Sequence, residues 1–585
     1  MFQQFGNFRS LDLASPINLL AFSLIIIGGS RGRCLEPVFA RPSLPISESL
    51  RSSLAALLAT FSRLCNYEHR INHMLNLRSH FATVLSIGLA VLAGNWTARG
   101  EIQLPSVLSD HAVLQRETPI RVWGWATPGA RLTVSFHAQT LTATTNDLGE
   151  WTAWLMPEHA GGPYSLTVDG GPHEGKKELR DVLVGDVWIA SGQSNMQMPL
   201  RGFPPTAFVK NADKEIAAAN NPMLRLLLVG RKSSDVPLQD LKGQWSQCTP
   251  QTASEFSAIA YLFGREIAKE ENVPIGLIDA TWGGTPIDSW LSLDTLGNNP
   301  ALLSAFSNRA SFADQQATLS AQIIAENAAA ASAKAAGRPV PIHPWHPEES
   351  SWLPAGLYNG MIAPLTNESI KGFLWYQGET DSAPARALHY STLFPALIED
   401  WRAQFRQGNL PFLFVQISSF RSPGEDWGMV RDAQRRTLFV ANTAMAVSLD
   451  VGNPDNVHPA DKQTVATRLA LAARGLVYGE SVAYASPLFR EATTEPGAIR
   501  VWFDNASGLR SEKESIEDFE VAGPDHHFVP ASATIQGETI VVSAPGLPDP
   551  RYVRYGWSNV VQTWFYNSAG LPGSTFTSEE VPVEP

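Results

Sequence analysis

Residues 182–198, VLVGDVWIASGQSNMQM, run from an apolar segment directly into a turn of Gly, Gln, Ser and Asn. The segment 182–190 is rich in Val and Ile, as expected of a strand buried on both faces, and Gly192 allows a tight exit. This pattern places Ser194 at the carboxyl end of a strand, where ligands collect in open α/β sheets. Ser194 is therefore a candidate nucleophile. The alternative is that Ser194 and Asn195 only cap the next segment, since both residue types are preferred at helix starts.

Length and composition restrict the class of protein. A chain of 585 residues is long enough for two to four domains. Its hydrophobic and charged fractions, 44% and 17%, are those of a soluble globular protein. A net charge of -12 without a long basic run argues against a nucleic-acid partner, because the phosphates would be repelled.

Two apolar runs lie near the start, at 17–29 and 82–93, and both are shorter than the ~20 residues that a membrane-spanning helix needs. The second run fits a signal peptide that starts at Met74, with Arg78 in its charged region. We therefore predict that residues 1–98 are a non-mature segment with a signal peptide, and that the mature chain is secreted or periplasmic with no membrane span.

The rest of the chain changes pattern twice. Residues 99–180 show short alternating strands with turns between them, which predicts a β-sandwich domain. Residues 181–480 alternate strands with helical patterns, which predicts an α/β domain with a mostly parallel sheet flanked by helices. Residues 481–585 return to short strands, including one expected at 560–566, and form a C-terminal β-rich region. The Ala-rich stretch 300–347 is expected to be a helical lid or rim.

A base for Ser194 is found in the sequence Asp455-Asn456-Val457-His458. A carboxylate three residues before an imidazole can hold one tautomer and stabilise the imidazolium, while Nε2 faces the serine. His458 is then the candidate general base, with Asp455 as the acid that orients it. The alternative is an ordinary Asp turn with an exposed histidine.

Donors for an oxyanion are expected at two other strand ends. The loop Trp282-Gly283-Gly284 can present main-chain N–H groups, because glycine lets a ligand approach the backbone closely. Gln377, after a predicted strand at 373–376, can add an amide donor. Each feature alone is consistent with a turn or a structural amide, but all of them follow predicted strands of one α/β domain.

Together these motifs resemble the sialate O-acetylesterase family of SGNH-type serine hydrolases. The resemblance is carried by four segments: 192–196 (GQSNM), 282–285 (WGGT), 375–379 (WYQGE) and His458-Pro459 followed by Lys462-Gln463. It implies an SGNH-like catalytic sheet, Ser194 as nucleophile, His458 as base, and an oxyanion hole formed by Ser194, Gly283, Gly284 and Gln377. Asn195 and Glu379 are expected to support the site or contact substrate, with Glu379 as a reserve acid. Family members carry the acid two residues before the histidine, where this chain has Asn456, so that role falls to Asp455 by spacing.

The chemistry implied is acyl transfer without metal or other cofactor, on an O-acetylated carbohydrate. Met196 takes the place of the last glycine of the α/β-hydrolase elbow, which favours the SGNH-like arrangement. Sialic acids are the first expected substrate. Acetylated xylan is an alternative, and a non-catalytic glycan-binding protein is a third possibility. A zinc deacetylase is disfavoured because no set of residues has ligand spacing. The oligomeric state and the acetyl position stay open.

Overall fold

The computed structural model describes residues 101–298, 321–341, 346 and 348–580. They belong to one compact unit, Arg99–Pro585. The predictions about Met74 and the signal peptide, and most of the Ala-rich stretch 300–347, lie outside the described residues and stay predictions. Within the described residues, no helix is both long enough and apolar enough to cross a membrane.

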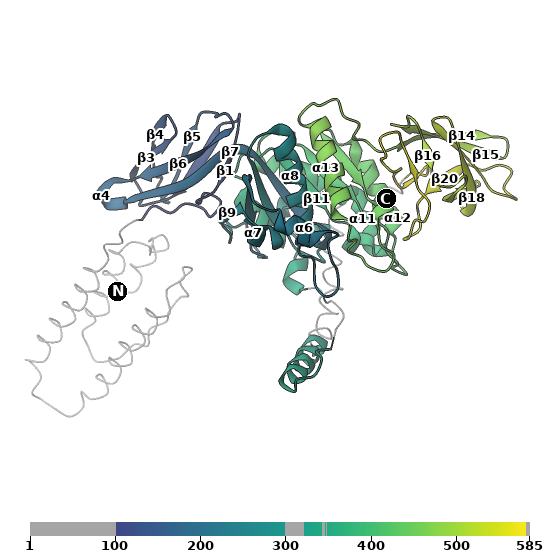
Figure 1. Ribbon diagram of the computed structural model, residues 1–585, viewed down its shortest axis with the longest axis horizontal. Coiled ribbons are helices and arrows are strands. Elements are labelled where there is room, and N and C mark those ends of the chain that lie inside the picture. Colours follow the sequence, from purple (N-terminus) through teal and green to yellow (C-terminus); the bar gives the residue numbers. More distant parts are fainter. Residues whose placement is uncertain (1–100, 299–320, 342–345, 347, 581–585) are drawn as a thin grey trace, which may run out of the picture. The chain divides into compact units, whose positions relative to one another are not determined.

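The central sheet carries the predicted catalytic segments (Figure 1). All neighbouring pairs from β13 to β8 are parallel, whereas β9 joins the edge in antiparallel orientation. The strands are, in spatial order, β13 (Thr443–Val447), β12 (Phe412–Gln416), β11 (Gly372–Tyr376), β7 (Lys176–Gly192), β10 (Ile275–Thr281), β8 (Asn221–Leu228) and β9 (Trp245–Cys248). β10, β11 and β12 are buried along their whole length, which explains why their sequences are mostly apolar.

β7 is longer than the predicted strand because it belongs to two sheet regions. Its first part pairs with β6 in antiparallel and with β1 in parallel orientation, and its second part lies between β10 and β11. The expected domain boundary at 180 falls inside this strand, and the division into domains stays a prediction. The preceding strands are β1 (Val113–Gln115), β2 (Ile120–Trp125), β3 (Arg131–Phe136), β4 (Gln139–Thr144), β5 (Glu150–Leu155) and β6 (Gly161–Asp169).

Helices cover the central sheet, as expected for a mixed α/β fold (Figure 1). The longer ones are α8 (Ala258–Glu271), α11 (Pro384–Phe405), α12 (Trp427–Arg436) and α13 (Lys462–Leu476). Short helices are α4 (Gly171–Glu174), α5 (Ser194–Gln197), α6 (Ala212–Ala217), α7 (Pro250–Ser254) and α9 (Leu293–Asn298). Single 3-10 or π turns occur at Ile287–Trp290, Glu349–Trp352, Tyr358–Ile362, Ala363–Leu365, Glu379–Ser382, Thr437–Phe439 and Leu449–Val451.

An aromatic cluster fills the core between β11 and α11. The ring of Trp375 meets those of Trp290 and Trp401 edge-on, at centroid distances of 6.1 and 5.6 Å, and all three side chains are fully buried. Such edge-to-face pairs add specific geometry to the burial of large apolar surfaces. The cluster therefore holds α11 against the strand that leads to Gln377.

The C-terminal residues form an antiparallel sheet in the order β14-β15-β19-β18-β17-β20-β22. Its strands are β14 (Leu488–Glu495), β15 (Ala498–Asp504), β17 (Ile516–Ala522), β18 (Val529–Gln536), β19 (Thr539–Ser543), β20 (Tyr552–Tyr555) and β22 (Phe576–Thr577), and β16 (Arg510–Ser511) pairs with β21 (Phe565–Tyr566). The strand expected at 560–566 was wrong except for β21. The N–H groups of Gln562 and Thr563 donate to the carboxylate of Asp518 instead of to a neighbouring strand.

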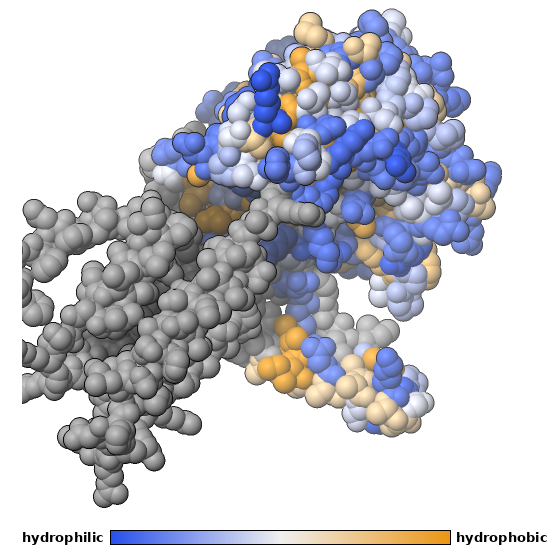
Figure 2. All heavy atoms as spheres, turned by 90° about the vertical axis from the view of Figure 1, so that its left-hand side faces the viewer, coloured by the Kyte–Doolittle hydropathy of each residue, from blue (hydrophilic) through white to orange (hydrophobic). Residues whose placement is uncertain are grey.

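Figure 2 views the protein from the side where β3, β4 and β6 lie in Figure 1. The described surface there is mostly hydrophilic, with apolar side chains in small separate spots. The exposed apolar residues of β5 and of the residues on either side of it include Leu148, Trp154 and Met156.

Cys248 is buried at the end of β9, where its thiol packs as a small apolar group.

Candidate active site

Three of the predicted site loops begin at the same level of the sheet. Gly192, at the end of β7, is in register with Thr281 of β10 on one side and with Tyr376 of β11 on the other. Because these strands are parallel, their carboxyl ends lie on one edge. The segments after them carry Ser194, the Gly283-Gly284 pair, and Gln377 with Glu379, so the fold brings these segments together.

The turn before Ser194 requires glycine at position 192. Gly192 has φ 124°, and a Cβ on it would lie 2.2 Å from the carbonyl oxygen of Tyr376. This close approach lets the N–H of Gln193 donate to the same carbonyl at 3.0 Å. Ser194 is then the first residue of α5, where main-chain N–H groups have no partner within the helix.

Gly283 lies directly against the serine. A Cβ at Gly283 would come within 3.1 Å of Cβ of Ser194 and 2.9 Å of Oε1 of Gln197. The N–H of Gly283 donates to that same Oε1 at 2.7 Å. The role of Gly283 as an oxyanion donor stays a prediction, and its N–H would have to leave Gln197 to perform it. Gly284 lies in the same loop with φ 70°, and its carbonyl accepts a hydrogen bond from the indole N–H of Trp352 at 2.8 Å.

His458 lies in the loop between β13 and α13. Its Nε2 is buried and has no hydrogen-bond partner among the described residues. Its main-chain N–H donates to Oδ1 of Asn456 at 2.9 Å, and its ring meets the ring of Phe203 edge-on at 5.4 Å. Burial, together with the ammonium of Lys462, lowers the pKa of His458 to about 4. The imidazole is thus neutral at neutral pH, which is the form a general base needs.

Asp455 does not orient His458 in this structure. Its side chain is 74% exposed and forms an ion pair with the exposed Arg421. Among the described residues, no hydrogen bond connects its carboxylate to the imidazole. The acid role of Asp455 stays a prediction, and its carboxylate would have to leave Arg421 to perform it. The carboxylate three residues before the histidine finds a cationic partner in the loop after β12, which the local spacing does not reveal.

Gln377 is fully buried, and its side-chain amide is occupied. Its Nε2 donates to the carbonyl of Thr285 at 3.1 Å and to the carboxylate of Asp381, while its Oε1 accepts from the hydroxyl of Tyr390 at 3.0 Å. Because both N–H groups of the amide are engaged, one of these bonds would have to break before Gln377 could bind an oxyanion, and its role as a third donor stays a prediction. The residue instead ties the loop after β10 to that after β11.

Asn195 and Glu379 form a buried polar network with Lys462, all three being at most 7% exposed. Nδ2 of Asn195 donates to Oε1 of Glu379 at 2.5 Å and to the carbonyl of Val457 at 2.9 Å, and its Oδ1 accepts from Nζ of Lys462 at 2.6 Å. The bond to Val457 links the residue after Ser194 to the residue before His458. The segments of the candidate nucleophile and the candidate base are therefore held together by one amide.

Burial dominates the electrostatics of this network. It raises the pKa of Glu379 to about 7 and lowers the pKa of Lys462 to about 7. Oε2 of Glu379 is buried without a partner among the described residues. Glu379 thus supports Asn195, as one of its predicted roles required, and makes no contact with His458 that would fit a reserve acid.

The sequence pattern missed the supporting residues. Lys462, the first residue of α13, belongs to the Lys462-Gln463 pair that carries part of the family resemblance, but its contact with Asn195 was not predicted. Gln197 lies on the turn after Ser194 and accepts from Gly283, whereas Gln193 accepts from Gly378 and Thr380 at 3.3 and 3.2 Å. No local signal marks these two glutamines, because their partners come from other strands.

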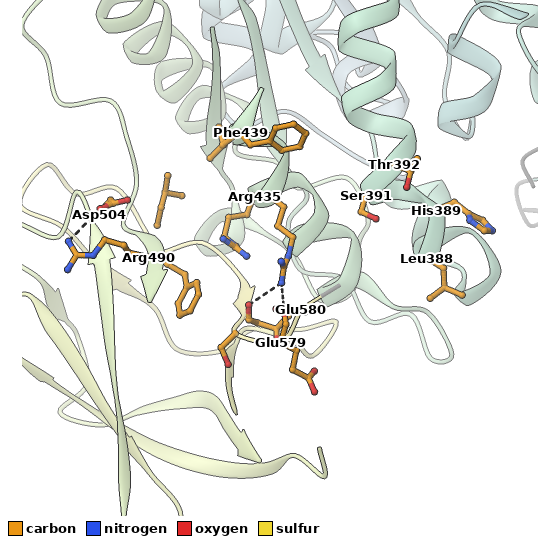
Figure 3. A pocket seen from close by; sticks show the side chains of 16 residues that line it. Leu388, His389, Ser391, Thr392, Arg435, Phe439, Arg490, Asp504, Glu579 and Glu580 are labelled. Carbon is orange, nitrogen blue, oxygen red and sulfur yellow. Dashed lines mark hydrogen bonds and ion pairs between the residues drawn. The ribbon is translucent and has the colours of Figure 1, made fainter. Parts of the chain in front are cut away.

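A separate hollow of about 750 Å³ lies where α11 and α12 meet the C-terminal sheet (Figure 3). It contains none of the predicted site residues. Its arginines are paired: Arg435 and Arg436 with Asp432, and Arg490 with Asp504. In the described part of the chain, no group of three or more His, Cys, Asp or Glu side chains is placed to hold a metal ion.

Comparison with known proteins gives consistent results. A family model described as "Carbohydrate esterase, sialic acid-specific acetylesterase" matches residues 333–474, a range that includes His458 but not Ser194. The sialate O-acetylesterase of Homo sapiens is 30% identical over 553 residues, covering 84% of this chain and 96% of the human protein. The sialate O-acetylesterase of Pongo abelii is 33% identical with the same coverage.

A solved structure is also similar over most of its length. The crystal structure of a carbohydrate acetylesterase from Xanthomonas citri matches with a TM-score of 0.70 and 35% sequence identity. The match covers 82% of this chain and 99% of that protein. Because the relatives match over nearly their whole length and the structure extends the likeness to the fold, this chain belongs to the sialate O-acetylesterase family.

Proposed function

We propose that this protein is a serine-dependent carbohydrate O-acetylesterase in which Ser194 is the nucleophile and His458 the general base. The observation that carries the proposal is the unpartnered, buried Nε2 of His458, on a segment bonded through Asn195 to the serine turn. A buried ring nitrogen without a partner is costly, and a serine hydroxyl or a leaving alcohol would satisfy it. Family membership supplies the ester chemistry.

The proposed reaction is acyl transfer in two steps. Ser194 Oγ attacks the acetyl carbonyl while its proton passes to Nε2 of His458. The tetrahedral oxyanion accepts hydrogen bonds from the main-chain N–H groups of Ser194 and Gly284. His458 then protonates the departing sugar oxygen, which leaves an acetyl-enzyme. Water, deprotonated by His458, attacks this ester, and acetate is released as Ser194 regains its proton.

The proposal departs from a complete Ser-His-Asp triad. Burial and the contact with Phe203 hold the imidazole of His458 without a carboxylate on it. The sheet places the candidate nucleophile after β7, and Met196 stands where the α/β-hydrolase elbow has its last glycine, which supports an SGNH-type arrangement.

O-acetylated sialic acids are the proposed substrates. The support is the description of the family model and the names of the mammalian relatives. The solved relative is described more broadly, as a carbohydrate acetylesterase, so acetylated xylan is the appropriate comparison substrate.

The test is acetate release from O-acetylated sialic acid and from acetylated xylan by the full chain, compared with Ser194→Ala and His458→Ala. Ser194→Ala is isosteric apart from the hydroxyl and should abolish release, and His458→Ala should reduce it by about 10³-fold or more. Faster acetate release from O-acetylated sialic acid than from acetylated xylan supports the substrate proposal. Release that persists in Ser194→Ala would overturn the serine mechanism, and faster release from xylan would overturn the substrate assignment.

A further inference from the structure

We propose that Lys462 is a positioning residue for the esterase reaction: its ammonium holds the amide of Asn195 in the orientation that ties the serine turn to the histidine loop. This inference rests on the proposed roles of Ser194 and His458. It assigns a function to a buried lysine that the reaction itself does not use.

Both sides of the Asn195 amide have hydrogen-bond partners. Nδ2 faces only acceptors, the carboxylate of Glu379 and the carbonyl of Val457, at 2.5 and 2.9 Å. Oδ1 faces an ammonium at 2.6 Å, and an ammonium can only donate. Rotating the amide by 180° would place its N–H groups against the ammonium and its oxygen against two acceptors. The orientation is therefore decided by Lys462 on one side and Glu379 on the other.

Burying the ammonium of Lys462 at this contact costs a considerable desolvation free energy. Its side chain is 1% exposed, and Asn195 is its one hydrogen-bond partner among the described residues. The ammonium lies 5.9 Å from the ring centroid of Tyr376, and Glu379 balances its charge across the amide. A buried lysine with so few partners adds little to stability, because replacing such groups by apolar ones is often neutral or stabilising. Stability alone does not explain its presence.

The same ammonium acts on the candidate base. His458 is the other titratable group facing Lys462, and the positive charge contributes to lowering the pKa of the imidazole. Glu379 in turn faces Asp381 and Tyr376 besides Lys462, and burial of that carboxyl is the main influence on it. Removing the ammonium therefore has two separable consequences: loss of the Asn195 orientation, and a higher pKa for His458.

The test compares Lys462→Met, Lys462→Arg and Asn195→Asp with Lys269→Met, a control at a lysine that is 79% exposed. We expect Lys462→Met to lower kcat by about 10²-fold with KM within threefold, because a misplaced base costs about that much. The acid limb of its kcat/KM profile should move to higher pH, toward the ordinary histidine range. Lys462→Arg keeps the charge, so its acid limb should stay in place while kcat falls less.

Asn195→Asp tests the orientation without touching the lysine. It replaces Nδ2 by an oxygen, which cannot donate to the carboxylate of Glu379 or to the carbonyl of Val457, so kcat should fall as in Lys462→Met. The double variant Lys462→Met/Asn195→Asp should lose no more kcat than either single variant, because both substitutions act through one contact. Additive losses, unchanged kcat in Lys462→Met, or a loss with the acid limb unmoved would each overturn the inference.

Folding and function are separated by two further readouts. Circular dichroism and thermal unfolding identify any variant that does not fold. If Lys462→Met does not fold, Lys462→Arg and Asn195→Asp test the positioning role by the same criteria. If the wild type releases no acetate, or Ser194→Ala remains active, the proposed function fails. If Ser194→Ala is inactive but the Lys462 and Asn195 variants resemble the control, only the present inference fails.

Discussion

Replacing Asp455 by Asn should leave most of the activity intact. Asp455 stands three residues before His458, and in a working triad the loss of the acid costs about 10⁴-fold in kcat. In this structure, however, its carboxylate is 74% exposed and paired with Arg421, itself 65% exposed. A surface ion pair of this kind contributes about 0–1 kcal/mol. At about 1.4 kcal/mol per tenfold change in rate, even a full loss of that contribution slows the reaction by about fivefold or less.

The two hypotheses thus differ by about three orders of magnitude, the gap between a fivefold and a 10⁴-fold loss. The assay is kcat/KM for acetate release by Asp455→Asn, measured beside the wild type and Ser194→Ala. Arg421→Gln is the matched control, since it breaks the same ion pair from the other side and should have an equally small effect. A loss of 10³-fold or more in Asp455→Asn, with Arg421→Gln near wild type, would refute the reasoning. It would show that the Asp455 carboxylate reaches His458 in the working enzyme.

Three further outcomes follow from the site and its surroundings. Burial and Lys462 lower the pKa of His458 to about 4. We therefore expect kcat/KM to stay near its maximum as the pH falls through 6.5 and to drop only near pH 4, where the imidazole gains a proton. A pH profile of kcat/KM that bends at 6.5 would contradict this. Gly283→Ala places a methyl group 2.9 Å from Oε1 of Gln197 and 3.1 Å from Cβ of Ser194, so kcat should fall by about tenfold or more. Gly297→Ala serves as the control, because a methyl group there meets none of the described neighbours within 4 Å. Burial raises the pKa of Cys248 to about 11, so the native protein should react with iodoacetamide at pH 8 far more slowly than the unfolded chain, as mass spectrometry of the labelled thiol would show.

The sheet and the candidate nucleophile were predictable from local sequence. A strand buried on both faces needs mostly apolar residues, and the runs that became the second half of β7, β10, β11 and β12 show that pattern, with single carboxylates at Asp186 and Asp279. The family resemblance, read from four short motifs, is confirmed by relatives that match across most of the chain.

Three predicted site residues have partners in this structure that local sequence does not reveal, and the physical reason is the same for each. Asp455, Gln377 and the N–H of Gly283 each have the right chemistry at the right distance along the chain, and each is occupied by a residue from another segment. A carboxylate binds whichever cation the fold brings nearest, and an amide donates to whichever acceptors surround it. Neither choice is encoded in the spacing of neighbouring residues.

The sequence by itself determined the mixed α/β class, the turn that places Ser194 at the end of β7, and the family, because burial pattern and glycine geometry act over a few residues. Only the tertiary structure decided which hydrogen-bond partner each polar group has. It left Nε2 of His458 without a partner among the described residues, and it joined Asn195, Glu379 and Lys462 from three separate segments. Hydrogen bonds between distant segments exist only after the chain has folded, so the partners of a polar side chain belong to the fold rather than to its local sequence.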